Sequence, residues 1–359
     1  MKQIGGITSQ LSCLRFDHIG SLFEEARTYQ IKSALSPAFC LHSRDKFREE
    51  INGGPFAHEH EYYESLVSAF LLHVEYLPLD HHIFLAPVPI ADEYNRYDDY
   101  LSATDRWNDF VTVGSKIDSG KNRLNYVILG RLLQDMIPSL VEESNLSTTG
   151  VGAKYPLCHP DLSVNNIFID DDCNITCVID WAFSTSVPLS ALLVTPGLPH
   201  PRDEMAPSLI RAFRNGFEED QHSFGDGLKT ETDRRHAVWD NCRKIWLFTR
   251  LVNLDSLQDV CHFAELYTSV TGKEDVSIPT LLQAVQTQEE FLRKALSLSA
   301  DDQSSSDTER QETEYFSRVG LKRLALSRKL TLFSDMSRDF LADQRLWKWL
   351  AKAVNLEEG

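Results

Sequence analysis

The sequence has no long apolar run and no apolar leader. No stretch reaches the roughly eighteen consecutive apolar residues that a membrane-spanning helix needs. The N-terminus does not join a charged region to an apolar stretch, as a signal peptide does. We therefore expect a cytoplasmic protein with no membrane partner.

Basic residues are scarce relative to acidic ones. The chain has 36 Lys and Arg against 53 Asp and Glu, a net charge of −17. Such a chain repels polyanions at long range, so nucleic acid is not expected as a partner. A neutral or cationic small molecule fits better, although an acidic surface also serves solubility alone.

The patterns of disulfide frameworks, zinc sites and hydrolases are missing as well. The seven cysteines are odd in number and scattered, which favours a reducing compartment. They complete no zinc-ligand pattern, and neither a G-x-S-x-G elbow nor an H-E-x-x-H helix occurs. With 359 residues and 42% hydrophobic content, the chain is still long enough to bury a large core.

The most informative stretch runs from Leu157 to Trp181, here named the hairpin segment. Two apolar, β-branched runs, 166–169 and 175–179, flank the polar tetrad 171–174, which predicts a β-hairpin. Antiparallel pairing brings the start of the first strand beside the end of the second, so Asn166 and Asp180 should lie roughly 5 Å apart at Cβ. Two hard oxygen ligands suit Mg²⁺, which also binds waters and substrate phosphates.

Asp161 lies five positions before Asn166, in the polar loop that leads into the hairpin. From this loop its carboxylate can accept a proton from a hydroxyl nucleophile. A calcium-binding loop starting at Asp170 is not expected, because Ile175 stands where such a loop needs Gly and Trp181 where it needs Glu.

These motifs together resemble a known family. His159-Pro160-Asp161-Leu162, followed by Asn166 and by Val178-Ile179-Asp180-Trp181, resembles the catalytic and metal-binding segments of aminoglycoside phosphotransferase-like enzymes, relatives of choline kinases and protein kinases. The resemblance implies Asp161 as the catalytic residue, Asn166 and Asp180 as Mg²⁺ ligands, and His159 as the structural brace of the loop. It also implies ATP and Mg²⁺ as cofactors and a small-molecule acceptor.

Helical spacing of apolar residues surrounds the hairpin segment. We predict helices over 59–77, 101–113, 126–141, 206–217, 232–257, 278–298 and 315–354. The fold class expected is α+β and predominantly helical, and the resemblance makes it a protein-kinase-like C-terminal lobe. We predict this lobe over 1–300, an acidic, Ser-rich flexible linker over 301–314 and a C-terminal helical segment over 315–359.

Two further groups are candidates for ligand contact. The stretch 94–100 holds three tyrosines among acidic residues, which suits either an aromatic box for a cation or ordinary packing at a helix start. By the resemblance, His200, Arg202 and Asp203 lie near the acceptor pocket, and a Pro-rich structural turn is the alternative for them.

The sequence lacks the part of a kinase that covers the nucleotide phosphates, a Gly-rich strand-turn-strand and a Lys that pairs with them. Gly5-Gly6, Gly53-Gly54-Pro55 and Lys116 do not have this context, so no cofactor-binding residue is identified. We therefore expect the N-terminal ATP lobe to be absent or severely truncated. Three interpretations stay open: a phosphotransferase, a catalytically impaired kinase-like binding or scaffold protein, or a shortened product of a complete enzyme.

Overall fold

The computed structural model describes most of the chain. The described residues are 1–40, 43–47, 49–77, 91–113, 120–145, 155–198, 204–221, 232–253, 262–273 and 278–288, with a few single residues between 291 and 323. The helices are α1 Lys2–Ser12, α2 Pro37–Cys40, α3 Glu59–Tyr76, α4 Tyr97–Val113, α5 Gly120–Asn145, α6 Leu189–Leu192, α7 Pro207–Gln221, α8 Thr232–Asn253, α9 His262–Thr271 and α10 Ile278–Gln286. The strands are β1 Arg15–Phe16, β2 Gly20–Glu25, β3 Thr28–Lys32, β4 Tyr155–Cys158, β5 Ile167–Ile169, β6 Ile175–Val178 and β7 Thr185–Ser186.

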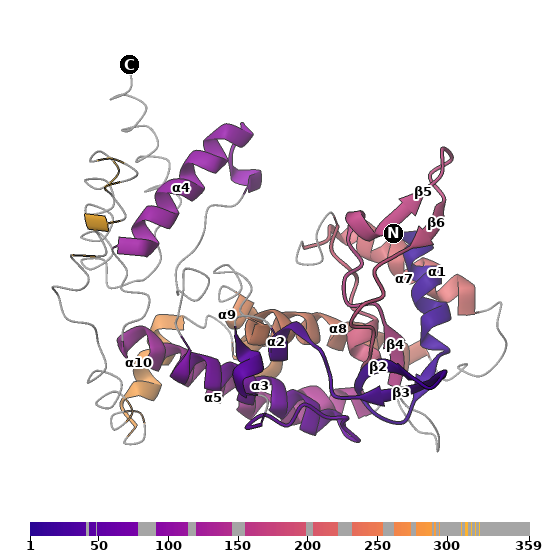
Figure 1. The fold of residues 1–359 in the computed structure, drawn as a ribbon, viewed down its shortest axis with the longest axis horizontal. Coiled ribbons are helices and arrows are strands. Elements are labelled where there is room, and N and C mark those ends of the chain that lie inside the picture. The colour runs from indigo at the N-terminus through magenta and orange to yellow at the C-terminus, as the bar shows by residue number, and fades with distance from the viewer. Residues whose placement is uncertain are drawn as a thin grey trace. The chain divides into compact units, whose positions relative to one another are not determined.

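The described elements form an α+β fold that is mainly helical, as predicted (Figure 1). The chain divides into two units, unit 1 with Met1–Phe70 and Leu133–Asn253, and unit 2 with Leu71–Leu132 and Leu254–Gly359. All of the strands given above and the whole hairpin segment belong to unit 1. Most of 301–359 lies outside the described residues, so the predicted linker and C-terminal helical segment stay predictions.

The predicted helices are largely confirmed where the structure describes them. Helix α3 matches the predicted 59–77 within one residue, and α7 and α8 begin within one residue of their predicted starts. Helix α4 begins four residues before the predicted 101, and Asp98 and Asp99 in its first turn suit the positive end of the helix dipole. Helix α5 extends the predicted 126–141 at both ends and continues through Pro138. No helix in the described ranges has both the length and the apolar character to cross a membrane.

A five-stranded antiparallel sheet holds both ends of the hairpin segment. Its order is β1-β4-β7-β2-β3, so β4, which leads into Asp161, lies beside β7, which follows Asp180. Leu157 pairs with Ser186 and Cys158 with Thr185. The buried hydroxyl of Ser186 donates to the His18 carbonyl (2.7 Å) and accepts from the Gly20 amide (3.2 Å). The segment between β4 and β7, which contains the loop and the hairpin, therefore begins and ends on neighbouring strands of this sheet.

The predicted hairpin is confirmed as β5 and β6, which form a sheet of their own. Ile167 pairs with Val178, and a bulge interrupts the register between Phe168 and Ile169. The inner side of the hairpin packs on a buried cluster that comes mainly from α1, α7 and α8. The cluster comprises Ile4, Leu162, Leu193, Phe213, Phe217, Val238, Trp239 and Cys242, and Ile167, Ile175 and Val178 of the hairpin pack against it.

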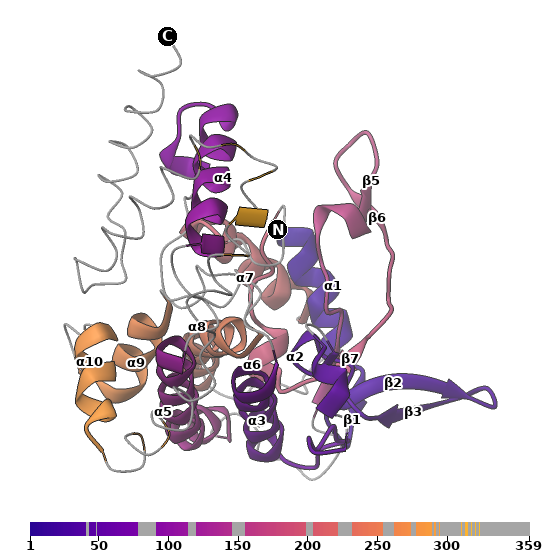
Figure 2. The ribbon, with the colours of Figure 1, turned by 60° about the vertical axis from the view of Figure 1, so that its left-hand side comes forward.

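Helix α1 supports the turn of the hairpin. It lies beside α7 in both ribbon views (Figures 1 and 2). A Cβ on Gly5 would come within 2.1 Å of the Phe213 carbonyl oxygen, and one on Gly216 within 1.9 Å of the Lys2 carbonyl oxygen. Only glycine allows the two backbones to approach this closely. The side chain of Gln3 on α1 donates to the Cys173 carbonyl (3.1 Å) and accepts from the Ile175 amide (2.7 Å).

Candidate functional site

His159 connects the two ends of the hairpin segment. Its buried ring follows β4, and its Nδ1 accepts a hydrogen bond from the Asp161 amide (3.1 Å). Because Nδ1 is an acceptor, Nε2 carries the proton of the neutral ring and donates it to the Ile179 carbonyl (2.9 Å). The Trp181 ring lies edge-to-face on the imidazole, with centroids 4.8 Å apart. This single side chain fixes the loop before the hairpin against the chain after it.

Asn166 orients the carboxylate of Asp161. The short 3-10 turn Val164–Asn166 buries the Asn166 side chain, whose Nδ2 donates to the Asp161 carbonyl (2.9 Å) and to its Oδ2 (3.0 Å). Both partners are acceptors, so the amide NH₂ must face Asp161 and Oδ1 must face away. In the described part of the chain, no group donates to Oδ1 of Asn166 or to Oδ1 of the exposed Asp161.

Asp180 lies at the same open end of the hairpin, one residue beyond the expected pairing. The Ile179 amide donates to the Asn166 carbonyl (3.0 Å), so Asn166 lies opposite Ile179 rather than Asp180. The offset follows from the register of the hairpin, in which Ile167 pairs with Val178 and Ile179 therefore lies opposite Asn166. The chain then turns at Asp180, whose φ is +59°. Asp tolerates this left-handed conformation better than most residues, and its exposed carboxylate makes no hydrogen bond to the described residues.

The oxygen atoms of Asn166 and Asp180 suit a Mg²⁺ site with few protein ligands, rather than a metal site built from protein ligands alone. Within the described ranges, no three His, Cys, Asp or Glu side chains gather closely enough to hold a metal ion. Mg²⁺ does not need such a cage, because it takes one or two protein ligands together with waters and substrate phosphates. Oδ1 of Asn166 and the carboxylate of Asp180 are hard oxygen donors without competing hydrogen bonds. The predicted ligand pair is therefore chemically suited to Mg²⁺.

Comparison with known proteins adds no information about the function of this site. No family model, curated protein or solved structure matches the chain. The kinase-like lobe and the roles of His159, Asp161, Asn166 and Asp180 therefore stay predictions.

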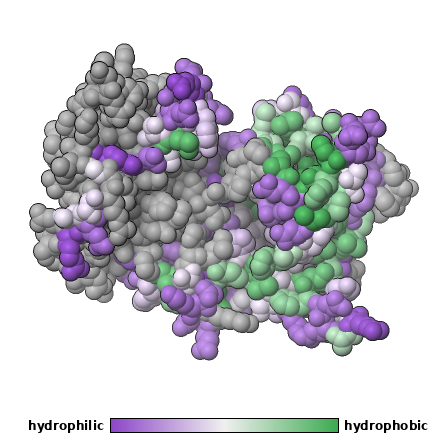
Figure 3. Space-filling model, turned by 45° about the horizontal axis from the view of Figure 1, so that its top comes forward, coloured by the Kyte–Doolittle hydropathy of each residue, from purple (hydrophilic) through white to green (hydrophobic). Residues whose placement is uncertain are grey.

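An exposed apolar surface, here named the apolar shelf, lies on the hairpin and on the residues directly before and after it. Six large apolar side chains form it, with exposed fractions of 40–60%: Val164, Phe168, Ile169, Ile179, Trp181 and Phe183. In Figure 3, apolar side chains gather on the surface of unit 1. Large exposed apolar patches mark binding surfaces for ligands or proteins. The shelf was not predicted from the sequence. A signal was present, because both strands are apolar at nearly every position, whereas a hairpin with one face in solvent alternates apolar and polar residues.

The hairpin segment itself has acidic side chains but no Lys or Arg. From residue 155 to 201 the sequence has no Lys or Arg, but it has five aspartates: Asp161, Asp170, Asp171, Asp172 and Asp180. A phosphorylated ligand at this site therefore needs a bound cation or a basic group from elsewhere to compensate its charge.

Asp170 has a structural role in the hairpin turn. Its Oδ1 accepts from the backbone amides of Asp172 (3.0 Å) and Asn174 (2.8 Å), and its Oδ2 accepts from the Asn174 side chain (3.2 Å). These hydrogen bonds, above all the one from the Asn174 backbone, lower the pKa of Asp170. The carboxylate is therefore used to close the turn.

A cysteine nucleophile is not supported beside His159. Burial raises the pKa of the neighbouring Cys158 to about 12, so this thiol stays protonated near neutral pH. Because a thiolate is the reactive form of cysteine, Cys158 is a packing residue rather than a catalytic one.

The remaining predicted contacts are less defined. In unit 2 the rings of Tyr94 and Tyr97 each lie 6.0 Å from the ring of Tyr100, in tilted arrangements, and Tyr97 is 69% exposed. A cation box there stays a prediction. His200, Arg202, Asp203 and Lys116 lie outside the described residues.

Proposed function

We propose that the chain is the catalytic-loop part of a Mg²⁺-dependent phosphotransferase that moves a phosphoryl group from ATP to a hydroxyl of a small molecule. The observation that carries the proposal is the network in which His159 and Asn166 together fix Asp161. Positioning and charge stabilisation are most of what the protein contributes to phosphoryl transfer.

Asp161 has the geometry of a general base. Asn166 holds its Oδ2, and its Oδ1 is open to solvent and makes no hydrogen bond to the described residues. An acceptor hydroxyl that donates to Oδ1 would be oriented for attack and would lose its proton to this carboxylate.

Asn166 and Asp180 are the residues that would hold Mg²⁺, which supplies the positive charge that nucleotide phosphates require. The absence of Lys and Arg from 155–201 makes this charge essential within the segment. The apolar shelf supplies exposed apolar and aromatic surface beside these ligands, on which a nucleobase can stack.

Binding without phosphoryl transfer is the second candidate function. The lack of a basic residue in the segment and the exposure of the apolar shelf both favour it, because they support docking of a ligand or protein without supporting turnover. In this case Asp161 would contribute to the structure of the loop alone.

A transfer assay tests the first candidate directly. The purified chain is incubated with Mg-ATP and a panel of amino-alcohols and aminoglycosides, and phosphorylated product is measured. The matched control is Asp161→Asn, which keeps the size of the side chain but removes its basic carboxylate. Product formation that depends on Asp161 supports the proposal, and equal rates for the two proteins contradict it.

Calorimetric titration with ATP, with and without Mg²⁺, separates the two candidates further. The phosphotransferase proposal expects Mg²⁺-dependent binding that Asp180→Asn weakens. If ATP does not bind, or if its affinity changes neither with Mg²⁺ nor in Asp180→Asn, a function without nucleotide is favoured.

A further inference from the structure

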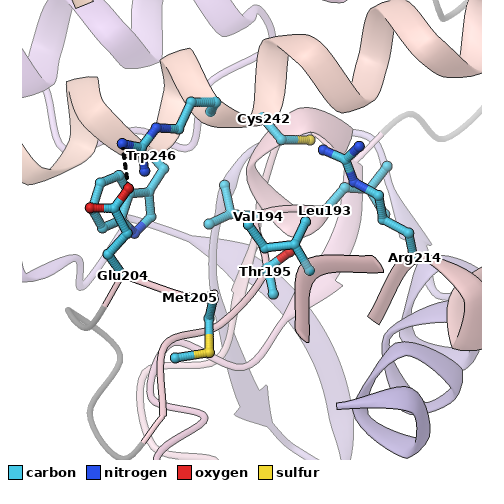
Figure 4. Close-up of a pocket in the computed structure, with 10 residues that line it drawn as sticks. Leu193, Val194, Thr195, Glu204, Met205, Arg214, Cys242 and Trp246 are labelled. Atoms are coloured by element: carbon cyan, nitrogen blue, oxygen red, sulfur yellow. Dashed lines mark ion pairs between the residues drawn. The ribbon is translucent and has the colours of Figure 1, made fainter. Parts of the chain in front are cut away.

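A second site lies in unit 1 between the loop after α6 and the helices α7 and α8. It is a pocket of about 70 Å³, lined by Leu193, Val194, Thr195, Glu204, Met205, Ile210, Arg214, Cys242, Arg243 and Trp246 (Figure 4). A single water needs only about 10–15 Å³ on this scale, so the pocket has room for a small organic molecule.

The two arginines of the pocket differ in their partners. Arg243 forms an ion pair with Glu204 (2.7 Å), and its guanidinium lies 4.7 Å from the centre of the Trp246 ring. Arg214 stacks on Trp239 at 5.0 Å and donates through Nη2 to the Trp239 carbonyl (3.3 Å). No carboxylate of the described residues pairs with Arg214, and its buried Nε has no hydrogen-bond partner among them.

Cys242 does not balance the charge of Arg214. Figure 4 shows its sulfur beside the guanidinium, and the Sγ atom donates to the Val238 carbonyl (3.1 Å). Burial raises the pKa of this thiol, and the nearby guanidinium offsets the rise only in part. The thiol is therefore neutral near neutral pH, and Arg214 keeps an uncompensated positive charge beside apolar walls.

We propose that this pocket binds a small monocarboxylate with an apolar tail, whose carboxylate pairs with Arg214. A carboxylate matches the planar guanidinium and balances its positive charge, with which no carboxylate of the described residues pairs. Leu193, Met205 and Ile210 surround the tail with apolar surface. Among the described lining residues, the charges of Arg243 and Glu204 cancel in their ion pair and Arg214 adds one positive charge, which suits a monoanion better than a phosphate dianion.

This inference does not depend on the proposed phosphoryl transfer, because none of the residues of the pocket belongs to the hairpin segment. The test is calorimetric titration of the full chain with butyrate and isovalerate, with butyramide and isovaleramide as neutral counterparts and inorganic phosphate as a competing anion. The carboxylates should bind at least about tenfold more tightly than the amides, since charge-assisted hydrogen bonds are the stronger ones.

Three variants localise the binding. Arg214→Gln should weaken carboxylate binding at least about tenfold, and Ile210→Trp should block it by filling the pocket without changing any charge. Arg211→Gln, on the exposed side of the same helix, is the matched control and should bind like the parent chain. A melting curve of each variant establishes that it is folded, and Ile210→Trp decides the test if Arg214→Gln does not fold.

Three results would each overturn the proposal. The first is equal affinity for carboxylates and amides, or no binding of either. The second is unchanged carboxylate binding in a folded Arg214→Gln or Ile210→Trp variant. The third is tighter binding of phosphate than of the carboxylates.

Discussion

Nε2 of His159 donates a 2.9 Å hydrogen bond to the backbone carbonyl of Ile179, across the two ends of the hairpin segment. The same ring accepts from the Asp161 amide, so one side chain sets the distance between the proposed base and the residue preceding the proposed metal ligand Asp180. The loop and the hairpin should therefore respond together when this contact is removed.

Replacement of His159 tests this relationship. His159→Ala removes two hydrogen bonds and leaves a cavity at a side chain that is only 3% exposed, so we expect the free energy of unfolding to fall by about 2–3 kcal/mol. Denaturant titration measures the change. The control is His60→Ala, which removes a half-exposed histidine paired with Glu64 and should cost less than about 0.5 kcal/mol. Equal losses for the two variants would argue against a bracing role.

Asp170 gives a pH-dependent prediction. Its pKa is lowered in the folded chain, so the carboxylate stabilises the turn above the ordinary pKa of aspartate, and this stability is lost as the pH falls through the lowered value. Asp170→Ala should reduce hydrogen-exchange protection of β5 and β6 near neutral pH and have little effect well below the lowered pKa. The exposed neighbour Asp171 supplies the control variant, Asp171→Ala, which should change little at either pH. A pH-independent effect of Asp170→Ala would contradict this account.

Variants of two adjacent asparagines, Asn165 and Asn166, test whether Asn166 belongs to the proposed metal site. Asn166→Ala removes both the donor to Asp161 and the proposed metal ligand, so Mg²⁺-dependent ATP binding should weaken at least about tenfold. Asn165 is exposed and makes no hydrogen bond to the described residues, and Asn165→Ala should leave binding unchanged. Calorimetry on both variants measures the difference, and similar affinities would remove Asn166 from the site.

Two glycines on facing helices test the support beneath the hairpin. Gly216→Ala places a Cβ 1.9 Å from the Lys2 carbonyl oxygen, so α1 and α7 must separate and we expect a loss of about 1–3 kcal/mol. At Gly6 the nearest atom to a new Cβ is 3.9 Å away, so Gly6→Ala fits and should stabilise the helix by up to about 1 kcal/mol. Thermal unfolding of both variants checks the opposite signs. Similar shifts would show that the two helices are not in tight contact.

The sequence predicted the helices and strands whose apolar and polar pattern lies within one short, continuous stretch of residues. The hairpin was predicted within one residue at each end, because its two apolar runs and polar turn are contiguous in sequence. Helix α3 was predicted as closely, since its apolar spacing repeats over several turns and Pro78 follows it. The one-residue offset of Asp180 was not predicted, because the apolar pattern of the two strands does not show their pairing register or the bulge between Phe168 and Ile169.

The sequence by itself determined which polar residues lie near the hairpin, since His159, Asp161, Asn166 and Asp180 are neighbours along the chain. Only the tertiary structure decided what supports and surrounds them. Strands β4 and β7 have four and two residues, too few for a recognisable pattern, and they pair only because the fold brings them together. The exposure of the apolar shelf and the pocket at Arg214 likewise depend on which helices cover a surface, and contacts between distant segments decide this.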